Sequence, residues 1–511
     1  MRSTFHSIET AKRALFTEQA NISTTGHNIS NANTPGFSRQ RVNLVASRPI
    51  EAPGYMRTNI PGQLGTGVEF TSITRVREKF LDDQFRNANR SLGEWSVKAD
   101  SLSKLETIFN EPSDSGVRTV MDNFWSSWTD LAKDPESITG RKIVRENALA
   151  LVDAFNETNK HLADLKTDLT TNINTMTSQI NSISKSIADL NLEIKRLKAY
   201  GDNPNDLMDE RDSLVDQLSE MVNVSVVDTD DGYEVSVGGI MLVDGLNAPG
   251  TSVAALEAQF NGGGIVGGKI EGLIVSRDQI ITDYQSQLDA MVDTLANGEI
   301  TITLPVGSTY QGTNLTEEQT VTVKGINGLH QLGYLFNTPP ATPQQAGDIF
   351  VTSDGSATFT AENIRLSQTI VDDPMNIATS MRTEVLNGAS ETIKGNNTLA
   401  NLMAGLKDTK FQFSPVASQN GIASGTIDEF YASMIGQLGL QSQEADRQST
   451  NQQDIVTQVD SRRQSVSGVS LDEEMSDLIK YQHAYSAAAR FMTAIDETLD
   501  KVINGMGVVG R

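Results

Sequence analysis

The chain contains 511 residues, 38% of them hydrophobic, and carries a net charge of -24 from 41 Lys and Arg against 65 Asp and Glu. This excess of acidic residues argues against a nucleic-acid partner, because binding to phosphates depends on clustered cations. The absence of cysteine excludes disulfides, thiolate metal sites and a cysteine nucleophile. No stretch approaches the roughly 18 consecutive apolar residues of a membrane-spanning helix, and the N-terminal residues lack the apolar core of a signal peptide. We therefore expect a soluble chain of several domains that does not insert into a membrane.

The spacing of apolar residues near the N-terminus predicts a helix. Ile8, Leu15, Ile22 and Ile29 repeat every seven residues, which is typical of a helix with one apolar stripe. The polar stretch "HNISNANTPGFSRQ", residues 27–40, follows directly. Within it, Pro35 suits the first central position of a tight turn, and Gly36 suits the second, where φ is positive. The residues alone therefore predict a turn that ends the first helix.

The strongest periodic signal lies in the middle of the chain. Apolar residues there alternate steps of four and three, which is the pattern of a coiled-coil seam: Leu169, Ile173, Met176, Ile180, Ile183, Ile187, Leu190, Ile194 and Leu197. The residues between them are rich in Thr, Asn and Ser, which are mediocre helix formers, so this helix depends on packing. We expect it to run from about residue 151 to 199 and to end at "GDNPN", where Pro204 cannot continue it.

The part of the chain after this helix mixes helical and strand patterns. A helix is predicted over 207–222, followed by two alternating runs around an Asp231-Gly232 turn, which indicates a β-hairpin. The segment "DTDDGYE" within that hairpin matches a calcium loop poorly, so a solvated turn is favoured. Residues 269–296 have a helical pattern. Strand-like runs follow at "EITITLPV", "QTVTVKGI", "DIFVTS" and "SATFTA", residues 299–306, 319–326, 348–353 and 356–361.

The C-terminus returns to a helix with an apolar stripe. Its seven-residue repeat comprises Leu471, Leu478, Tyr485, Met492, Leu499 and Met506. Ser470 and Glu473 have the spacing of a capping box, which predicts that the helix begins at Leu471. Because neither terminal stripe has a nearby core, the two must pair with each other, contact other subunits, or stay unfolded in solution.

The sequence offers little for catalysis. The histidines are scattered singly, so their spacing suggests neither a metal site nor a catalytic triad. The acidic run of residues 472–474 is explained by favourable charge at a helix start, and adjacent residues on a helix point in different directions. We expect no catalytic, metal or cofactor-binding residues.

Four segments carry a resemblance to a known family. "HNISNANTPGFSRQRV" closely resembles the N-terminal motif of bacterial flagellar rod, hook and hook-associated proteins, in which an Asn-Thr-Pro-Gly-aromatic turn follows the first assembly helix. "SRQ" after the aromatic residue is similar to the hook-associated subset. "GTGVEFTSITRVREKFLDDQFR", "NDLMDERDSLVDQLSEMVNVSVV" and "VSLDEEMSDLIKYQHAYSAAARFM" resemble the hook-filament junction proteins within that subset. The family turn motif comprises Asn31, Asn33, Thr34, Pro35, Gly36 and Phe37.

The resemblance implies a mainly α fold with a β-rich insert: paired terminal coiled-coil helices, a long-helix rod domain and an outer β domain, as in flagellin-like axial proteins. The expected segments are an N-terminal assembly helix and turn (1–60), the first part of the rod (61–223), a β-hairpin region (224–265), a helix returning to the rod (266–298), a variable outer β domain (299–360), the second part of the rod (361–454) and a C-terminal assembly helix (455–511). The terminal stripes would form the assembly interface through Ile8, Leu15, Ile22, Ile29, Leu471, Leu478, Tyr485, Met492 and Leu499.

The resemblance also implies a function and partners. The chain would join the flagellar hook to the filament as a self-assembling ring or tube, between the hook protein and the next junction protein. It would leave the cell by type III export without a cleaved signal peptide, after binding a cytoplasmic chaperone at its C-terminal helix. Two alternatives stay open: another axial flagellar protein, of the hook type or the third hook-associated kind, and a secreted enzyme on a flagellin-like scaffold. A metal motif or an acid/base pair within residues 299–350 would favour the enzyme, and we find neither there.

Overall fold

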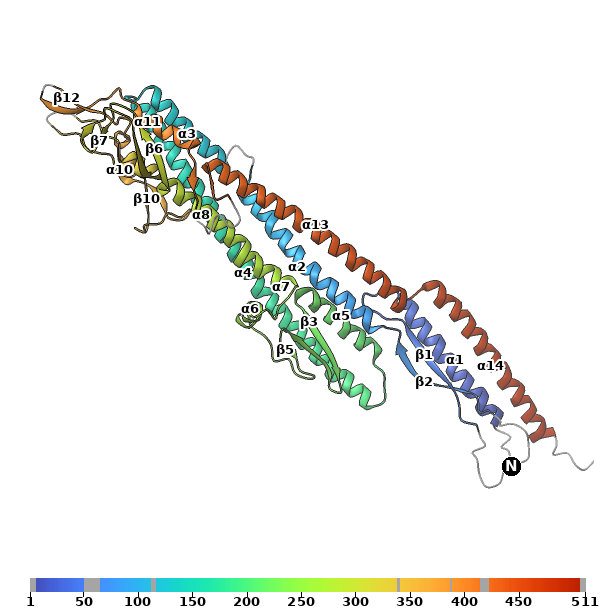
Figure 1. The fold of residues 1–511 in the computed structure, drawn as a ribbon. Coiled ribbons are helices and arrows are strands. Elements are labelled where there is room, and N and C mark those ends of the chain that lie inside the picture. The colour runs from blue at the N-terminus through green and yellow to red at the C-terminus, as the bar shows by residue number, and fades with distance from the viewer. Residues whose placement is uncertain are drawn as a thin grey trace, which may run out of the picture. The chain divides into compact units, whose positions relative to one another are not determined.

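The computed structural model describes residues 6–49, 65–111, 116–337, 341–386, 388–413 and 422–505. The chain forms two compact units, of which unit 1 comprises residues 1–94, 175–271 and 450–511, and unit 2 comprises residues 95–174 and 272–449. Both are mainly helical with small antiparallel sheets (Figure 1). The expected fold class, mainly α with a β-rich insert, is therefore confirmed.

Unit 1 contains both terminal helices, the hairpin region and parts of three longer helices. Its elements are α1 (His6–Ser30), β1 (Gln40–Ala46), β2 (Val68–Arg75), the start of α2 (Lys79–Phe109), the end of α4 (Ile138–Ala199), α5 (Asn205–Met221), β3 (Val224–Thr229), β4 (Gly232–Val237), β5 (Ile240–Val243), α6 (Val253–Asn261), the start of α7 (Lys269–Val275), the end of α13 (Ile427–Ser467) and α14 (Leu471–Gly505).

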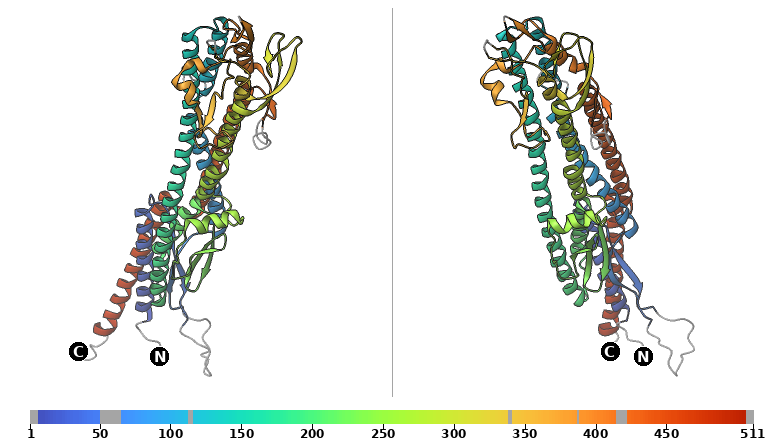
Figure 2. Two further views of the ribbon diagram at one scale, coloured as in Figure 1. Left: turned by 90° about the vertical axis from the view of Figure 1, so that its left-hand side faces the viewer. Right: turned by 60° about the vertical axis from the view of Figure 1, so that its left-hand side comes forward.

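The two terminal helices pair with each other. α1 and α14 lie side by side, and α1 also packs on the antiparallel β1–β2 ribbon (Figures 1 and 2). Their contact contains little buried apolar surface, since Ala11 and Ile495 are the buried apolar residues of the two helices within the described chain. The other buried side chains are polar: Thr17, Asn21, Thr24, Thr25, Asn28 and Glu474.

The long central helix α4 confirms the seam prediction in part. It begins at Ile138, earlier than expected, and ends at Ala199 before Gly201, whose φ is +92°. In unit 1 its buried residues are Ile180, Ile187, Ala188 and Ile194, together with the polar residues Thr177, Ser184 and Asn191. The predicted seam residues Met176, Ile183, Leu190 and Leu197 are half-buried instead. One polar row of the helix therefore faces inward: Ser184 donates to Ile180 O of the same helix, and Asn191 bonds to a neighbouring element.

Asn191 shows why this row is polar. Its amide nitrogen donates to Tyr233 O (3.0 Å) and Gly245 O (2.6 Å), and its amide oxygen accepts from the backbone N–H of Tyr233 (3.1 Å). These bonds dock the predicted hairpin, β3–β4, on α4. The turn of the hairpin is Asp230-Asp231 rather than Asp231-Gly232, because Gly232 pairs with Thr229 and opens β4. The hairpin prediction was right, and its turn was wrong by one residue.

Unit 2 is built from the remaining parts of α2, α4 and α13 and from a series of short elements. These are α3 (Val117–Lys133), η1 (Ser276–Ile280), α8 (Ile281–Asn297), β6 (Glu299–Leu304), β7 (Thr309–Tyr310), β8 (Thr313–Asn314), β9 (Gln319–Lys324), α9 (Gly325–His330), β10 (Phe350–Thr352), β11 (Ile364–Leu366), α10 (Gln368–Asp372), η2 (Pro374–Asn376), β12 (Thr383–Leu386), β13 (Ala389–Thr392), α11 (Thr398–Gly405), η3 (Leu406–Asp408), β14 (Phe411–Gln412) and β15 (Ser424–Gly425).

The strand predictions in unit 2 were largely right. The two alternating runs form β6 and β9 as predicted, and the strands pair from Glu299 with Lys324 to Leu304 with Gln319. β10 also forms, but its partner is β11, so the prediction of a strand over 356–361 was wrong. That segment is a loop whose backbone N–H groups, at Phe359 and Ala361, donate to the carboxylates of Asp293 and Asp289 on α8 at 2.9 and 2.8 Å.

A fully buried histidine makes the stability of unit 2 depend on pH. His330 Nδ1 lies 2.6 Å from Gly347 O, and Nε2 accepts from the backbone N–H of Ala378 at 3.0 Å. The ring is therefore neutral, and burial lowers its pKa from 6.5 to about 4, against the opposing effect of the Gly347 hydrogen bond. Because the unfolded chain takes up this proton first, the stability contributed by neutral His330 is present above pH 6.5 and is lost as the pH falls toward 4.

We expect the fold of unit 2 to lose about 2 to 3 kcal/mol through His330 between pH 7 and pH 4.5. Denaturant unfolding at both pH values measures this loss. His330→Gln has no proton to take up, so its loss over the same interval should be smaller by that amount. Equal losses for the two chains would contradict this assignment.

Candidate assembly site

The turn after α1 has the conformation that its residues predict. The backbone N–H of Phe37 donates to Thr34 O at 3.2 Å, and Gly36 has a φ of +82°. The hydroxyl of Thr34 donates to Asn31 Oδ1 at 3.2 Å, and the ring of Phe37 packs edge-on against His27 with centroids 5.4 Å apart. The turn is therefore fixed at both ends by its own side chains.

Gly36 is required by the close approach of α5 as well as by its backbone angle. A Cβ at this position would lie 3.2 Å from Ser213 Cβ and 3.3 Å from Ser213 Oγ. We expect Gly36→Ala to cost about 1 to 2 kcal/mol, because it adds backbone strain and pushes the turn away from α5. Urea unfolding measures the cost. Gly26→Ala is the matched control, since nothing lies within 4 Å of its Cβ and alanine favours a helix; equal stability of the Gly36→Ala chain and the wild type would refute this.

Each residue of the "SRQ" segment binds a different helix of unit 1. The N–H and hydroxyl of Ser38 both donate to the Asp209 carboxylate on α5 at 2.8 Å. Arg39 Nε donates to Glu474 Oε1 on α14 at 2.7 Å. The backbone of Gln40 exchanges two hydrogen bonds with the Asn28 side chain on α1, at 3.0 and 2.9 Å. This segment therefore joins the turn to three helices.

Three aspartates of α5 form a row at positions i, i+3 and i+7. Arg75 Nη1 lies 2.7 Å from Asp209 Oδ1 and 2.7 Å from Asp212 Oδ2. Arg86 Nε and Arg463 Nη1 approach the two oxygens of Asp216 at 2.8 and 2.6 Å. The row therefore binds arginine side chains from β2, α2 and α13.

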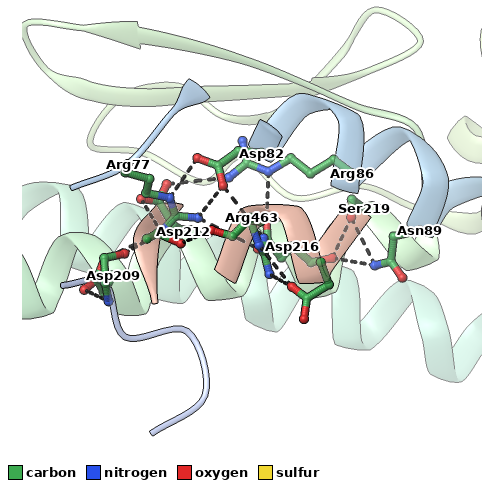
Figure 3. A network of polar contacts seen from close by, with 12 residues as sticks. Arg77, Asp82, Arg86, Asn89, Asp209, Asp212, Asp216, Ser219 and Arg463 are labelled. Atoms are coloured by element: carbon green, nitrogen blue, oxygen red, sulfur yellow. Dashed lines mark hydrogen bonds and ion pairs between the residues drawn. The ribbon is translucent and has the colours of Figure 1, made fainter. Parts of the chain in front are cut away.

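Arg77 connects this row to α2. Its Nε and Nη2 donate to the carboxylate of Asp82 at 2.7 and 3.0 Å, and its Nη1 lies 3.3 Å from Asp212 Oδ2. Figure 3 shows the labelled guanidinium and carboxylate groups converging along α5. We call this set the arginine–aspartate cluster: Arg75, Arg77, Arg86 and Arg463 with Asp82, Asp209, Asp212 and Asp216.

The cluster is buried, and its charges stabilise each other. The side chains of Asp212 and Arg75 are 3% and 11% exposed. Burial acts to raise the pKa of Asp212, but the charges of Arg77 and Arg75 outweigh it and hold that pKa below its usual range. The hydroxyl of Tyr233 donates to Asp212 Oδ1 at 2.8 Å, and burial together with the Asp212 charge raises the pKa of Tyr233 to about 12. Asp212 is therefore ionised at neutral pH and serves as the centre of the cluster.

Sequence reasoning missed this cluster, although signals for it were present. The row of Asp209, Asp212 and Asp216 lies on one face of a helix that the sequence predicted. The acidic run at 472–474 was explained by helix-start charge alone, whereas Glu473 and Glu474 bind Arg39. Ser470 does cap α14 by accepting from the Glu473 N–H at 3.5 Å, but the Glu473 carboxylate binds Arg39 at 3.1 Å and does not close the predicted box.

The structure places the predicted assembly residues on the paired terminal helices. Half-buried positions are Ile8, Leu15, Ile22, Ile29, Leu478, Met492 and Leu499. Leu471 and Tyr485 are exposed, and Met506 lies outside the described residues. Their role in assembly stays a prediction.

The terminal helices and the adjoining ribbon expose large apolar side chains. We call this set the uncovered apolar residues: Phe16 on α1, Leu44 and Val45 on β1, Phe70 on β2, and Leu471, Met475, Ile479, Tyr485, Phe491, Val502 and Ile503 on α14. Ile479 and Ile503 on α14 are 53% and 64% exposed, and a gathering of such side chains on adjoining elements is typical of an interaction surface. These side chains suit a surface that other molecules cover.

Within the described residues, no group of His, Asp or Glu is arranged to hold a metal ion. No helix in that part of the chain is long and apolar enough to cross a membrane.

Comparisons with known proteins agree with this geometry. Family models match at three places: "Flagella basal body rod protein" over residues 8–37, "Flagellar hook-associated protein FlgK helical domain" over 102–298, and "Flagellar basal body rod FlgEFG protein C-terminal" over 461–505. Flagellar hook-associated protein 1 of Bacillus subtilis (strain 168) is 34% identical over 537 residues, which cover 100% of both chains. The chain belongs to the flagellar hook-associated protein 1 family.

More distant members of the family also match over nearly their full length. Flagellar hook-associated protein 1 of Escherichia coli (strain K12) is 26% identical over 97% of this chain and 99% of its own. The Salmonella typhimurium (strain LT2) protein of the same name is 24% identical, with the same coverage. A solved structure of the flagellar hook junction protein FlgK from Burkholderia pseudomallei aligns with a TM-score of 0.47 and 14% identity, over 75% of this chain and 100% of that one. The chain is a structural component of the bacterial flagellum, as the resemblance implied.

Proposed function

We propose that this chain joins the flagellar hook to the filament by assembling with copies of itself into a ring or tube. The terminal helices α1 and α14 would form the inner assembly layer, with Ile8, Leu15, Ile22, Ile29 and the C-terminal stripe in the contacts between copies. The segments expected for the rod and for the outer β domain, residues 299–360, would lie outside that layer.

The observation that carries this proposal is the set of uncovered apolar residues on the paired termini. Full burial of one Leu, Ile or Phe side chain is worth about 1.5 to 3 kcal/mol. A contact that covered several of them would offset the entropy lost when two copies associate. A finished soluble surface would gain nothing from such side chains.

The same residues support the proposed partners. A chain that exposes Met475, Ile479, Phe491 and Ile503 on one helix before assembly is prone to aggregate. A cytoplasmic chaperone that covers α14 would prevent this until type III export delivers the chain to the hook. Contacts with the hook protein on one side and the next junction protein on the other would then complete the joint outside the cell.

The alternatives have less support. Another axial protein, of the hook type or the third hook-associated kind, would share the turn motif, but full-length identity to hook-associated protein 1 favours the junction. A secreted enzyme would need a set of catalytic groups in unit 2. His330, the histidine of that unit whose pKa is lowered by burial, has both ring nitrogens bonded to the backbone.

Electron microscopy of a strain that lacks this chain tests the proposal. We expect complete hooks without filaments, with filament protein released into the medium, and restoration of both by the wild-type chain. Normal filaments on the hooks of the deletion strain would contradict a junction role.

A further inference from the structure

A groove lies between the turn and α5, within unit 1. Its volume is about 460 Å³, and one wall is formed by His27 near the end of α1 and by the motif residues Asn31, Thr34, Pro35, Gly36 and Phe37. α5 forms the other wall with Asp206, Asp209, Glu210, Ser213, Leu214 and Gln217. The groove is therefore built by the family turn motif itself.

Within the described residues, Thr34 bonds only to Asn31 and Phe37 of the motif itself, so the outer face of the turn stays uncovered by this chain. Asn33, Thr34 and Pro35 are exposed. The turn is nevertheless anchored to α5, since Ser38 binds Asp209 with two hydrogen bonds and a Cβ added at Gly36 would lie only 3.2 Å from Ser213 Cβ. A preformed wall with an exposed face is the arrangement that a binding groove requires.

The chemistry of the groove favours a cationic side chain with an aliphatic stem. Pro35, Phe37 and Leu214 supply apolar surface, and Asp206 and Glu210 supply exposed carboxylates. Asp206 already binds His27 and Gln40, at 3.1 and 2.7 Å. The Glu210 carboxylate has no hydrogen-bond or ion-pair partner in the ranges that the structure describes. An arginine fits both features, because its stem packs on apolar surface while its guanidinium binds a carboxylate.

Arg41 on β1 is the arginine that such a contact would present. Gln40 and its register partner Arg75 both reach α5, where Gln40 donates to Asp206 and Arg75 binds Asp209. Successive residues of a strand point to opposite faces, so Arg41 and its partner Thr74 face away from α5. Arg41 is exposed, and its guanidinium has no ion-pair partner among the described residues. The groove therefore lies on the α5 side of the β1–β2 ribbon, and Arg41 lies on the opposite side of that ribbon.

We propose that Arg41 of one copy of this chain inserts into the groove of the next copy. Two complementary sites on opposite faces of a chain allow each copy to bind the next copy head to tail, and such contacts can close into a ring. This inference rests on the proposed self-assembly and specifies one contact of it. In this contact, the stem of Arg41 packs on Phe37 and Leu214, and its guanidinium binds Glu210 and Asp206.

Charge reversal in the deletion strain tests the contact. Glu210→Arg and Arg41→Glu should each reduce the fraction of cells with filaments at least about tenfold, because like charges would meet across the contact. The double variant Glu210→Arg/Arg41→Glu should restore filaments to within about twofold of the wild type, since the pair is re-formed with exchanged charges. Unfolding of each purified chain, with midpoints equal to the wild type, shows that the losses arise in assembly.

The controls separate this inference from the proposed function. Asp202→Arg and Arg462→Glu reverse exposed charges outside the groove and should leave filaments normal. Filaments in both single variants, or no rescue by the double variant, would overturn the Arg41 contact while the deletion strain still lacks filaments. Filaments in the deletion strain itself would overturn the proposed function instead.

Discussion

Replacing Asp212 with alanine should destabilise unit 1 by about 3 to 5 kcal/mol, since it leaves buried guanidinium groups without their carboxylate. Arg75 lies 2.7 Å and Arg77 lies 3.3 Å from this carboxylate, and Tyr233 donates to it at 2.8 Å. All three partners are buried or nearly so, and water cannot replace the lost charge at low cost. Arg86 lies 3.6 Å from the same carboxylate, so one substitution removes a charge that three arginines share.

Denaturant unfolding of the full chain measures this effect. Asp228→Ala, an exposed aspartate of the neighbouring hairpin, is the matched control and should change stability by no more than about 0.5 kcal/mol. The pKa of Asp212 is held below its usual range, so the stability it contributes is present above the unfolded pKa and is lost as the pH falls through the folded value. If Asp212→Ala and Asp228→Ala unfold at the same denaturant concentration, the cluster does not hold unit 1 together.

Charged substitutions among the uncovered apolar residues should abolish assembly without harming the folded monomer. Met475 and Ile479 are 49% and 53% exposed in one chain. Aspartate at either position is solvated in the monomer, so its free energy of unfolding should stay within about 0.5 kcal/mol of the wild type. In a ring, the same carboxylate would be buried without a partner at every copy, at a cost of several kcal/mol each. Motility and filament-bearing cells should both be lost.

The control for these variants is Gln482→Asp, at an exposed polar position of the same helix. It should assemble normally, because that side chain is not among the uncovered apolar residues. Tyr485→Asp, at one of the two exposed members of the predicted stripe, should behave like Ile479→Asp. A large loss of monomer stability in Ile479→Asp, or full motility with it, would count against an assembly role for α14.

Local patterns predicted the elements of this fold well. The periodicity of residues 169–197 lies inside α4, and the turn residues Pro35 and Gly36 adopt the conformation that their chemistry favours. Both depend on interactions between residues that are close in sequence. The same holds for the alternating runs of residues 299–306 and 319–326, which form the strands β6 and β9.

Long-range polar contacts could not be predicted in the same way. The seam of α4 turns toward Ser184 and Asn191 because Asn191 binds the backbone of a hairpin more than thirty residues later, at Tyr233 and Gly245. Arg463 reaches Asp216, which lies 247 residues earlier in the chain. Such pairs follow from how the helices pack, and the sequence around either residue does not indicate which residue it contacts.

The strand predicted over 356–361 shows a further limit. Its residues favour extended backbone, but Asp289 and Asp293 on α8 bind the backbone N–H groups that a strand partner would need. A carboxylate from another element therefore overrode local propensity.

Electron cryo-microscopy of the hook-filament junction tests the central claim most directly. We predict a ring of copies of this chain between hook and filament, with α1 and α14 paired inside it and Met475, Ile479 and Phe491 buried between neighbouring copies. A junction in which these side chains remain exposed to solvent, or in which this chain is absent, would contradict the account.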